Sequence, residues 1–135
     1  MADVVIAVDP GRDKCGVAVV RRDGGVLHQS VVAAGRMAEA VAALAAAHAV
    51  DTVVVGDRTG HKVAMAALGQ LRPGGRPLDI RTVDEHRSSD EARGRYWREN
   101  PPRGLSRLVP VTLLVPPVPV DDYVAVILAE RFYRQ

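Results

Sequence analysis

A short apolar run, residues 4–8, ends at Asp9 and restricts the fold more than any other part of the chain. The run is rich in β-branched residues and does not alternate with polar ones, which is typical of a central strand buried on both faces. Such a strand needs neighbouring strands on each side and helices above and below it. The sequence therefore predicts an α/β sheet whose central strand ends in a carboxylate.

Two more strands are expected directly after this one. Residues 16–22 and 26–32 have strand-like composition, and the Asp-Gly-Gly sequence at 23–25 is a hairpin turn signal. Because the connections are short, the first three strands should form an antiparallel meander.

Helical and strand patterns alternate along the rest of the chain, and Ser88 or Ser89 is a suitable cap for the third of these helices. Six prolines make residues 101–119 irregular, apart from a short apolar piece at 111–115. The remaining elements are predicted to be helix 36–48, strand 52–55, helix 61–71, strand 79–83, a helix from 88 or 89 to about 97, and helix 121–133.

This order predicts one α/β domain over residues 1–135 with a five-stranded mixed sheet. The sheet should combine the three-strand meander with two parallel strands and carry helices on both faces. If the first and fourth strands are neighbours, the chain direction reverses between them. Open α/β sheets place their sites at the carboxyl ends of strands at such a point.

The composition excludes several classes of protein. No apolar run approaches the roughly 20 residues that span a bilayer, and the start of the chain lacks a signal-peptide pattern. Cys15 is the only cysteine, which excludes an internal disulfide and a cysteine zinc cluster. These features predict a cytoplasmic protein without a membrane partner, and the net charge of +2 does not by itself indicate nucleic acid.

Carboxylates follow the strand ends that should share one edge of the sheet. Asp9 ends the first strand, Asp57 the fourth, and Asp84 and Glu85 the fifth. Asp121 opens the last helix on the same face as several apolar residues, so it should point at the sheet.

Converging carboxylates repel one another, and a divalent cation between them removes that repulsion. Oxygen ligands suit Mg²⁺ or Mn²⁺, and a metal site of this kind can activate water for phosphodiester hydrolysis. Each acid also has an ordinary structural interpretation, which stays open. Asp9 and Asp57 suit turns, Asp84 and Glu85 suit a helix start, and Asp121 suits a helix cap beside a solvated Asp122.

Three blocks of sequence resemble the YqgF family of RuvC-like resolvases and ribosomal-RNA processing nucleases. Residues 9–18 fit the pattern D-x-G-x-x-x-x-G-x-A, residues 84–92 resemble D-E-R-x-[ST]-[ST]-x-E-A, and residues 120–133 resemble the family's last helix. The blocks occur in the family's order and span nearly the whole chain.

The resemblance implies an RNase H-like fold and a metal-dependent nuclease. It implies that Asp9, Glu85 and Asp121 occupy the acidic-triad positions as catalytic residues and ligands of Mg²⁺ or Mn²⁺. The implied partners are RNA, DNA or four-way junctions, and the RuvC branch suggests a homodimer. Two positions depart from the family: Asp57 follows the fourth strand where a G-L-P type segment is usual, and His86 replaces the arginine after Asp-Glu.

Lys14 is predicted to contact the scissile phosphate. Six arginines fall between residues 87 and 107, together with Tyr96 and Trp97. This segment is either a solvated helix and loop or a phosphate track on which an aromatic ring stacks with an unpaired base. In the second interpretation, the substrate contacts are Arg87, Arg95 and Arg98.

Two other functions are compatible with parts of the sequence. A kinase of the actin and sugar-kinase superfold opens with a similar acidic hairpin but normally needs two such domains. A nucleic-acid-binding scaffold that has lost catalysis fits the altered segment around Asp57, although acids at all three triad positions argue against it.

Overall fold

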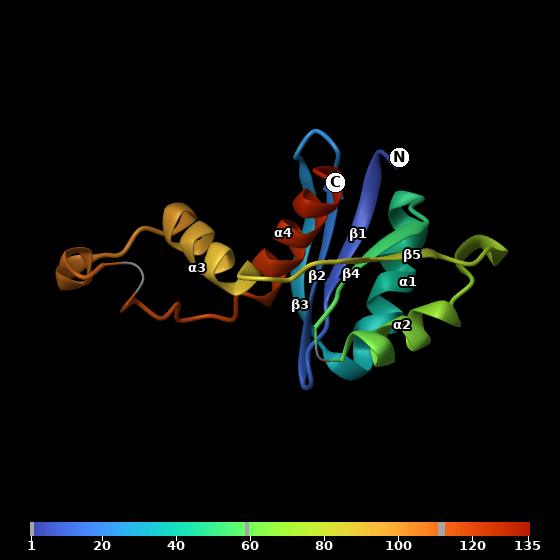
Figure 1. Cartoon of the computed structure of the whole chain (residues 1–135), viewed down its shortest axis with the longest axis horizontal. Coiled ribbons are helices and arrows are strands. Elements are labelled where there is room, and N and C mark those ends of the chain that lie inside the picture. Colours follow the sequence, from blue (N-terminus) through green and yellow to red (C-terminus); the bar gives the residue numbers. More distant parts are fainter. Residues whose placement is uncertain (1, 59, 111–112) are drawn as a thin grey trace.

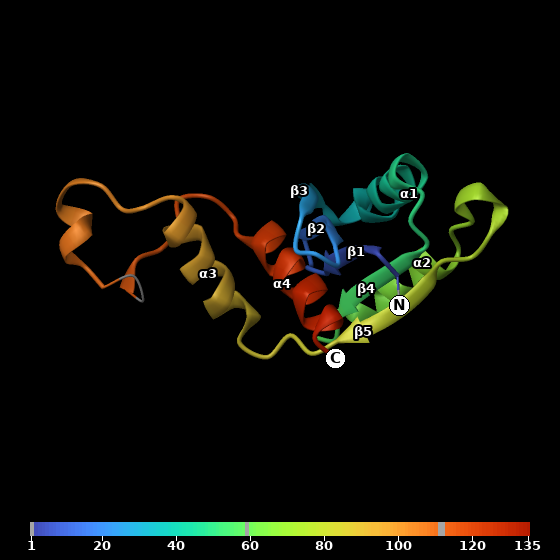
Figure 2. The same ribbon diagram turned by 90° about the horizontal axis from the view of Figure 1, so that it is seen from above.

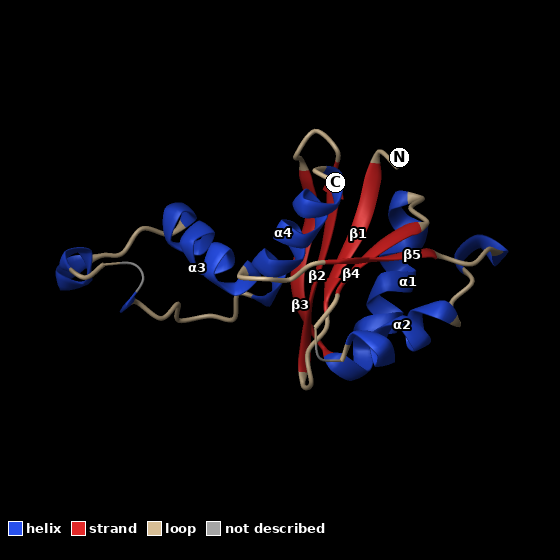
Figure 3. Ribbon diagram, in the orientation of Figure 1, coloured by secondary structure: helices blue, strands red, loops and turns tan. Residues whose placement is uncertain are grey.

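The computed structural model describes residues 2–58, 60–110 and 113–135, so the first part of the apolar piece at 111–115 lies outside the described residues. Five strands form one sheet in the order β3-β2-β1-β4-β5 (Figures 1 and 3). β1 is antiparallel to β2 and parallel to β4, which confirms the predicted mixed sheet and the reversal of direction beside β1. The strands are β1 (Val4–Asp9), β2 (Lys14–Arg21), β3 (Val26–Ala33), β4 (Thr52–Gly56) and β5 (Asp79–Val83).

Helices cover both faces of the sheet, as predicted. α4 crosses one face, and α1 and α2 lie on the other (Figures 1 and 2). α3 packs on α4 instead of on the sheet, and it projects from the domain together with the loop that follows it. The helices are α1 (Met37–His48), α2 (His61–Gly69), α3 (Ser88–Glu99) and α4 (Asp121–Tyr133), with short 3-10 turns η1 (Ala34–Arg36), η2 (Pro73–Gly75) and η3 (Gly104–Leu108).

The apolar run of β1 contributes to two cores. Val5 and Ala7 are buried against α4, whereas Ile6 and Val8 are buried on the face covered by α1 and α2. This division follows from the two-residue period of a strand. Ala7 stands opposite Ala18 of β2, and these small side chains make room for α4 directly above the site end of the sheet.

The start of α3 differs from the prediction. Neither Ser88 nor Ser89 caps the helix; the N-cap is Arg87, in a left-handed conformation with φ of 57°. Ser88 is already the first helical residue and is buried, and its N–H donates to the carbonyl of Glu85 at 2.9 Å. The tight turn after Glu85, rather than a serine hydroxyl, starts this helix.

Residues 101–110 and 113–119 are irregular apart from η3 and a single 3-10 position, in agreement with the proline content. Several large apolar side chains in this part of the chain are exposed, including Leu105, Leu108 and Leu113. Among the described residues, no helix has the length and apolar character needed to cross a membrane.

Candidate functional site

Asp9 lies at the carboxyl end of β1, between β2 and β4. Its carboxyl group hydrogen-bonds with that of Glu85 and is close enough to Asp121 to feel its charge. Burial, the hydrogen bond with Glu85 and repulsion by Glu85 and Asp121 raise the pKa of Asp9 to about 9. The raised pKa favours the protonated form of the Asp9 carboxyl group at neutral pH, as expected for acids forced together at one sheet edge.

Glu85 is buried, with an exposed fraction of only 4%. Its carboxylate fills the space above Gly56, since a Cβ at that position would lie 2.1 Å from Oε1. The Glu85 N–H donates to Oδ1 of Asp57 at 3.2 Å, which fixes the backbone before α3. The Oε1 atom of Glu85 is buried and has no hydrogen-bond partner among the described residues.

Asp121 is the first residue of α4, and the backbone of β2 touches it directly. A Cβ on Gly16 would lie 1.8 Å from the Asp121 carbonyl oxygen, so only glycine permits this approach. The Asp121 side chain does not cap the helix, because the N-cap residue is Val120. Instead, Asp121 Oδ2 lies 3.8 Å from Nζ of Lys14.

Asp122 is tied to the sheet, in contrast to the interpretation from sequence in which it is a solvated neighbour of Asp121. Its Oδ2 accepts a hydrogen bond of 3.0 Å from Nε2 of Gln29, which ties the start of α4 to β3. Its Oδ1 is buried and has no partner in the described part of the chain. Asp122 thus positions the helix end that carries Asp121.

The other two acids near the site, Asp57 and Asp84, accept hydrogen bonds from backbone N–H groups. Asp57 accepts the Glu85 N–H, and exposed Asp84 accepts the N–H of His86 at 2.9 Å in a local turn. Across residues 2–58, 60–110 and 113–135, no three Asp, Glu, His or Cys side chains are drawn together as a ready-made ligand set. Asp9 and Glu85 are in contact, while Lys14 engages the carboxylate of Asp121.

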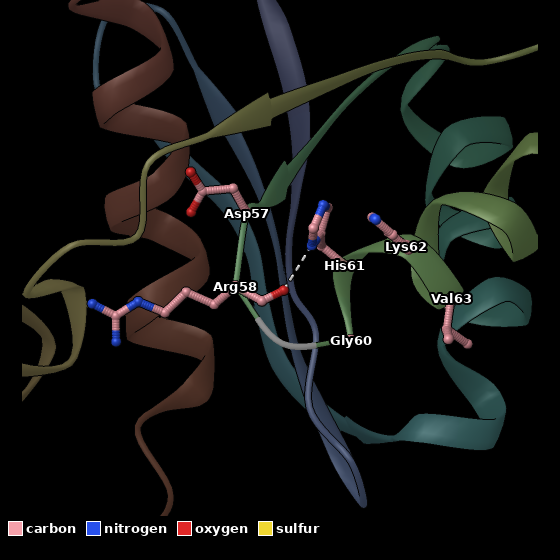
Figure 4. Close-up of a pocket in the computed structure, with 6 residues that line it drawn as sticks. All are labelled: Asp57, Arg58, Gly60, His61, Lys62 and Val63. Atoms are coloured by element: carbon pink, nitrogen blue, oxygen red, sulfur yellow. Dashed lines mark hydrogen bonds between the residues drawn. The ribbon is translucent and has the colours of Figure 1, made fainter.

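Cationic residues border the acids at the start of α2, where a pocket of ≈ 360 Å³ opens (Figure 4). Arg58 extends to one side of its loop, and His61 and Lys62 lie on the other. His61 Nδ1 lies 2.8 Å from the Arg58 carbonyl oxygen. Neither Arg58 nor Lys62 is predicted as a site residue from the sequence, although Arg58 belongs to the unusual segment after the fourth strand and Lys62 follows it closely.

The predicted substrate arginines differ in their surroundings. Arg95 is half-buried in an ion pair with Glu130 of α4, with N···O distances of 2.9 Å. Arg87 is exposed and lies 3.6 Å from Asp90. Arg98 is exposed and forms no ion pair within the described residues.

The aromatic residues of α3 are also separated by their environment. Tyr96 is buried against Tyr123, with ring centroids 5.8 Å apart, so it is not accessible for stacking. Trp97 is partly exposed and lines a pocket at the end of α3.

No protein-family model and no curated protein sequence matches the chain. Solved structures do match. Thermus thermophilus RuvC in complex with Holliday junction substrate gives a TM-score of 0.55 at 17% identity, covering 95% of this chain and 91% of that chain. A second T. thermophilus RuvC structure gives 0.55 at 16% identity, covering 97% and 95%. The likeness shows that the fold is RuvC-like and RNase H-like.

Proposed function

We propose that this protein is a divalent-metal-dependent nuclease that hydrolyses phosphodiester bonds in nucleic acid. The observation that carries the proposal is the buried contact between Asp9 and Glu85 beside Asp121, at the strand ends where an α/β sheet places its site. Forcing these acids together costs free energy, and such strain is typical of functional sites.

The residues fit a hard cation. Asp9, Glu85 and Asp121 would supply oxygen ligands, which Mg²⁺ and Mn²⁺ prefer. Glu85 Oε1 is a buried oxygen to which no described residue donates, and a cation would satisfy it and displace the proton held by Asp9. When bound, such an ion supplies an activated water and stabilises the leaving oxygen of the phosphodiester.

The chain itself positions these groups. Gly56 leaves room for the Glu85 carboxylate, and Gly16 lets Asp121 approach β2. Lys14 is proposed to contact the scissile phosphate, because its ammonium group already lies 3.8 Å from Asp121 and 52% of its side chain is exposed.

Flanking phosphates are proposed to lie along exposed Arg87 and Arg98. Arg58 and Lys62, which extend to opposite sides of the loop before α2, are proposed as further phosphate contacts. Arg95 is assigned to packing α3 on α4, because its guanidinium group is bound to Glu130.

The substrates proposed are structured nucleic acids: four-way DNA junctions, as in the T. thermophilus RuvC complex, or ribosomal-RNA precursors, as the YqgF resemblance implies. A homodimer is proposed on the same resemblance. Light scattering at micromolar protein tests it directly.

A catalytically inactive nucleic-acid-binding scaffold is the alternative, and one observation favours it. Lys14 and the proton on Asp9 already neutralise part of the acidic charge without any cation. In this case the protein would bind nucleic acid through its exposed arginines, and the acids would take no part in a reaction.

The decisive experiment incubates the protein with labelled four-way junction, single-stranded DNA and single-stranded RNA in Mg²⁺, Mn²⁺ or EDTA. Asp9→Asn is compared with Asp51→Asn, which removes an exposed carboxylate at the opposite end of the sheet. We expect metal-dependent cutting that Asp51→Asn retains and Asp9→Asn loses. Binding without cutting in every metal would support the scaffold, and cutting by Asp9→Asn would place the reaction elsewhere.

A further inference from the structure

A second pocket, of ≈ 410 Å³, lies at the carboxyl end of α3 and is not used by the proposed reaction. Its volume falls within the range of about 300–1,000 Å³ that is usual for small-molecule sites. The lining combines aromatic, amide, cationic and acidic groups, among them Trp97, Asn100, Arg103 and Glu99.

Trp97 is held in a fixed orientation at this pocket. Its ring packs edge-to-face on Tyr96, with centroids 5.0 Å apart and planes at 80°. Its indole N–H is buried and lacks an acceptor among the described residues. A fixed aromatic ring loses little entropy when a ligand stacks on it, and an unpaired N–H favours a ligand that brings an acceptor.

The pocket is connected through α4 to the three acids of the proposed metal site, Asp9, Glu85 and Asp121, which are called the carboxylate cluster. α3 runs antiparallel to α4, since Arg95 pairs with Glu130 and Tyr96 contacts Tyr123. The amide of Asn100, which lines the pocket, lies 3.5 Å from the hydroxyl of Tyr123. Tyr123 is two residues from Asp121, so the pocket and Asp121 both lie near the start of α4.

Charge around the pocket favours a polyanion. Residues 87–107 contain six arginines and three acids, whereas the whole chain has a net charge of only +2, so the excess positive charge is concentrated here. Arg98 and Arg103 are exposed and form no ion pair in the described parts of the chain. A neutral peptide would not use these cations, but a nucleic-acid backbone would.

We propose that this pocket, defined by Trp97, Asn100 and Arg103, binds one unpaired nucleobase of the nucleic-acid substrate. The base stacks on Trp97, and the neighbouring phosphates contact Arg98 and Arg103. The inference rests on the proposed function, because it takes nucleic acid as the ligand. It narrows the substrate class to molecules with an unpaired base near the cut, such as loops, single-stranded ends or opened junctions. Stacking of this kind tolerates any base sequence.

Trp97 is the only tryptophan in the chain, so its fluorescence reports on this pocket alone. The test titrates the whole protein in EDTA with a short oligothymidylate and with an abasic oligomer of equal length and charge. We expect the oligothymidylate to quench Trp97 and the abasic oligomer to leave the emission nearly unchanged. Equal quenching by both, or no quenching by either, overturns the proposal, as does quenching by a proline-rich peptide but not by oligothymidylate.

Variants test the energetic contribution by anisotropy of a labelled oligothymidylate. Trp97→Leu should weaken binding at least about fivefold, and Trp97→Phe should restore most of the loss because it keeps an aromatic face. Arg76→Gln, which removes an exposed arginine far from the pocket, is the charge control and should bind like the wild type. Circular dichroism confirms that each variant is folded, and wild-type affinity in folded Trp97→Leu overturns the proposal.

Because these measurements are made in EDTA, they separate the two proposals. Base-dependent quenching without cleavage in Mg²⁺ or Mn²⁺ upholds the pocket and rejects the nuclease. Metal-dependent cleavage combined with unchanged binding by Trp97→Leu rejects the pocket alone.

Discussion

The carboxylate cluster and the α3 region, residues 88–119, differ in how their functional side chains are held. In the cluster, Glu85 lies against Gly56, and the start of α4 lies against Gly16 at contact distances that exclude a side chain. In the α3 region, Arg98, Arg103, Leu105 and Leu108 are exposed.

This difference shows which functional side chains are held by buried packing. Groups proposed to act on the reacting phosphate are fixed by buried backbone. The arginines proposed to contact the phosphates of a variable substrate, Arg98 and Arg103, are exposed instead. Substitutions at the buried contacts of the cluster should therefore alter chemistry, stability or both, whereas substitutions of the exposed arginines in the α3 region should alter binding with little effect on stability.

The largest effect is expected from Asp9→Asn. Loss of one predicted metal ligand should lower cleavage by more than about 100-fold, measured with labelled substrate in Mg²⁺ or Mn²⁺. The same change should raise the melting temperature in EDTA at neutral pH. The asparagine amide is neutral, so it avoids the free-energy cost of placing an ionisable carboxyl group in a buried site beside Glu85 and Asp121.

The pH dependence of stability tests the second half of this prediction. The pKa of Asp9 is about 9 in the folded protein and near 3.8 otherwise, so the folded state binds the extra proton between these values. Wild-type stability should fall as pH rises through this window. The gain in stability of Asp9→Asn over the wild type should grow over the same range. A stability difference that stays constant with pH would contradict the raised pKa of Asp9.

Gly16→Ala should give the next largest effect, on stability. Its Cβ would meet the Asp121 carbonyl at 1.8 Å, and helix backbone cannot give way cheaply, so we expect a loss of about 3 kcal/mol or more. Urea denaturation measures it. Gly35→Ala is the matched control, because a Cβ there meets nothing within 4 Å; equal losses in both variants would remove the special role of Gly16.

Gly56→Ala should separate chemistry from stability. The three atoms nearest to its Cβ would all belong to the Glu85 side chain, with Oε1 at 2.1 Å, and a side chain can move while the backbone stays in place. We expect cleavage to fall about tenfold or more, a displacement effect, with a loss of stability much smaller than that of Gly16→Ala. Cleavage by Gly56→Ala at the wild-type rate would show that the reaction does not depend on the present position of the Glu85 carboxylate.

The smallest effects should distinguish Arg95 from Arg98. Arg95→Gln breaks the half-buried ion pair with Glu130 and should cost about 1 kcal/mol of stability with little change in oligonucleotide binding. Arg98→Gln should weaken binding a few-fold, with a lower salt dependence, and leave stability unchanged. The opposite pattern would make Arg95 the substrate contact.

The fold could be predicted because each element has a local pattern. Strand 79–83 and helix 121–133 have the predicted bounds, and the buried run of β1 correctly indicated a central strand. The start of α3 could not be predicted in the same way, since the left-handed Arg87 is imposed by the turn that buries Glu85.

The carboxylates could be assigned to one sheet edge from strand order, and the structure places Asp9 and Glu85 in contact there. Their further roles depend on partners distant in the sequence. Nothing near Arg95 indicates that Glu130 will bind it, and nothing near Asp122 indicates Gln29. Such pairs are set by helix packing, which a local pattern does not encode.

The contact between Gly16 and Asp121 also has a consequence for biosynthesis. It joins the opening hairpin to the last helix, and that helix covers one face of the sheet, including Val5, Ala7 and Val54. A chain still emerging from the ribosome therefore has its first carboxylate but not its third, and it exposes an apolar sheet face. Under the proposed function, cleavage would therefore require a chain that has been translated through α4, because Asp121 is the first residue of that helix.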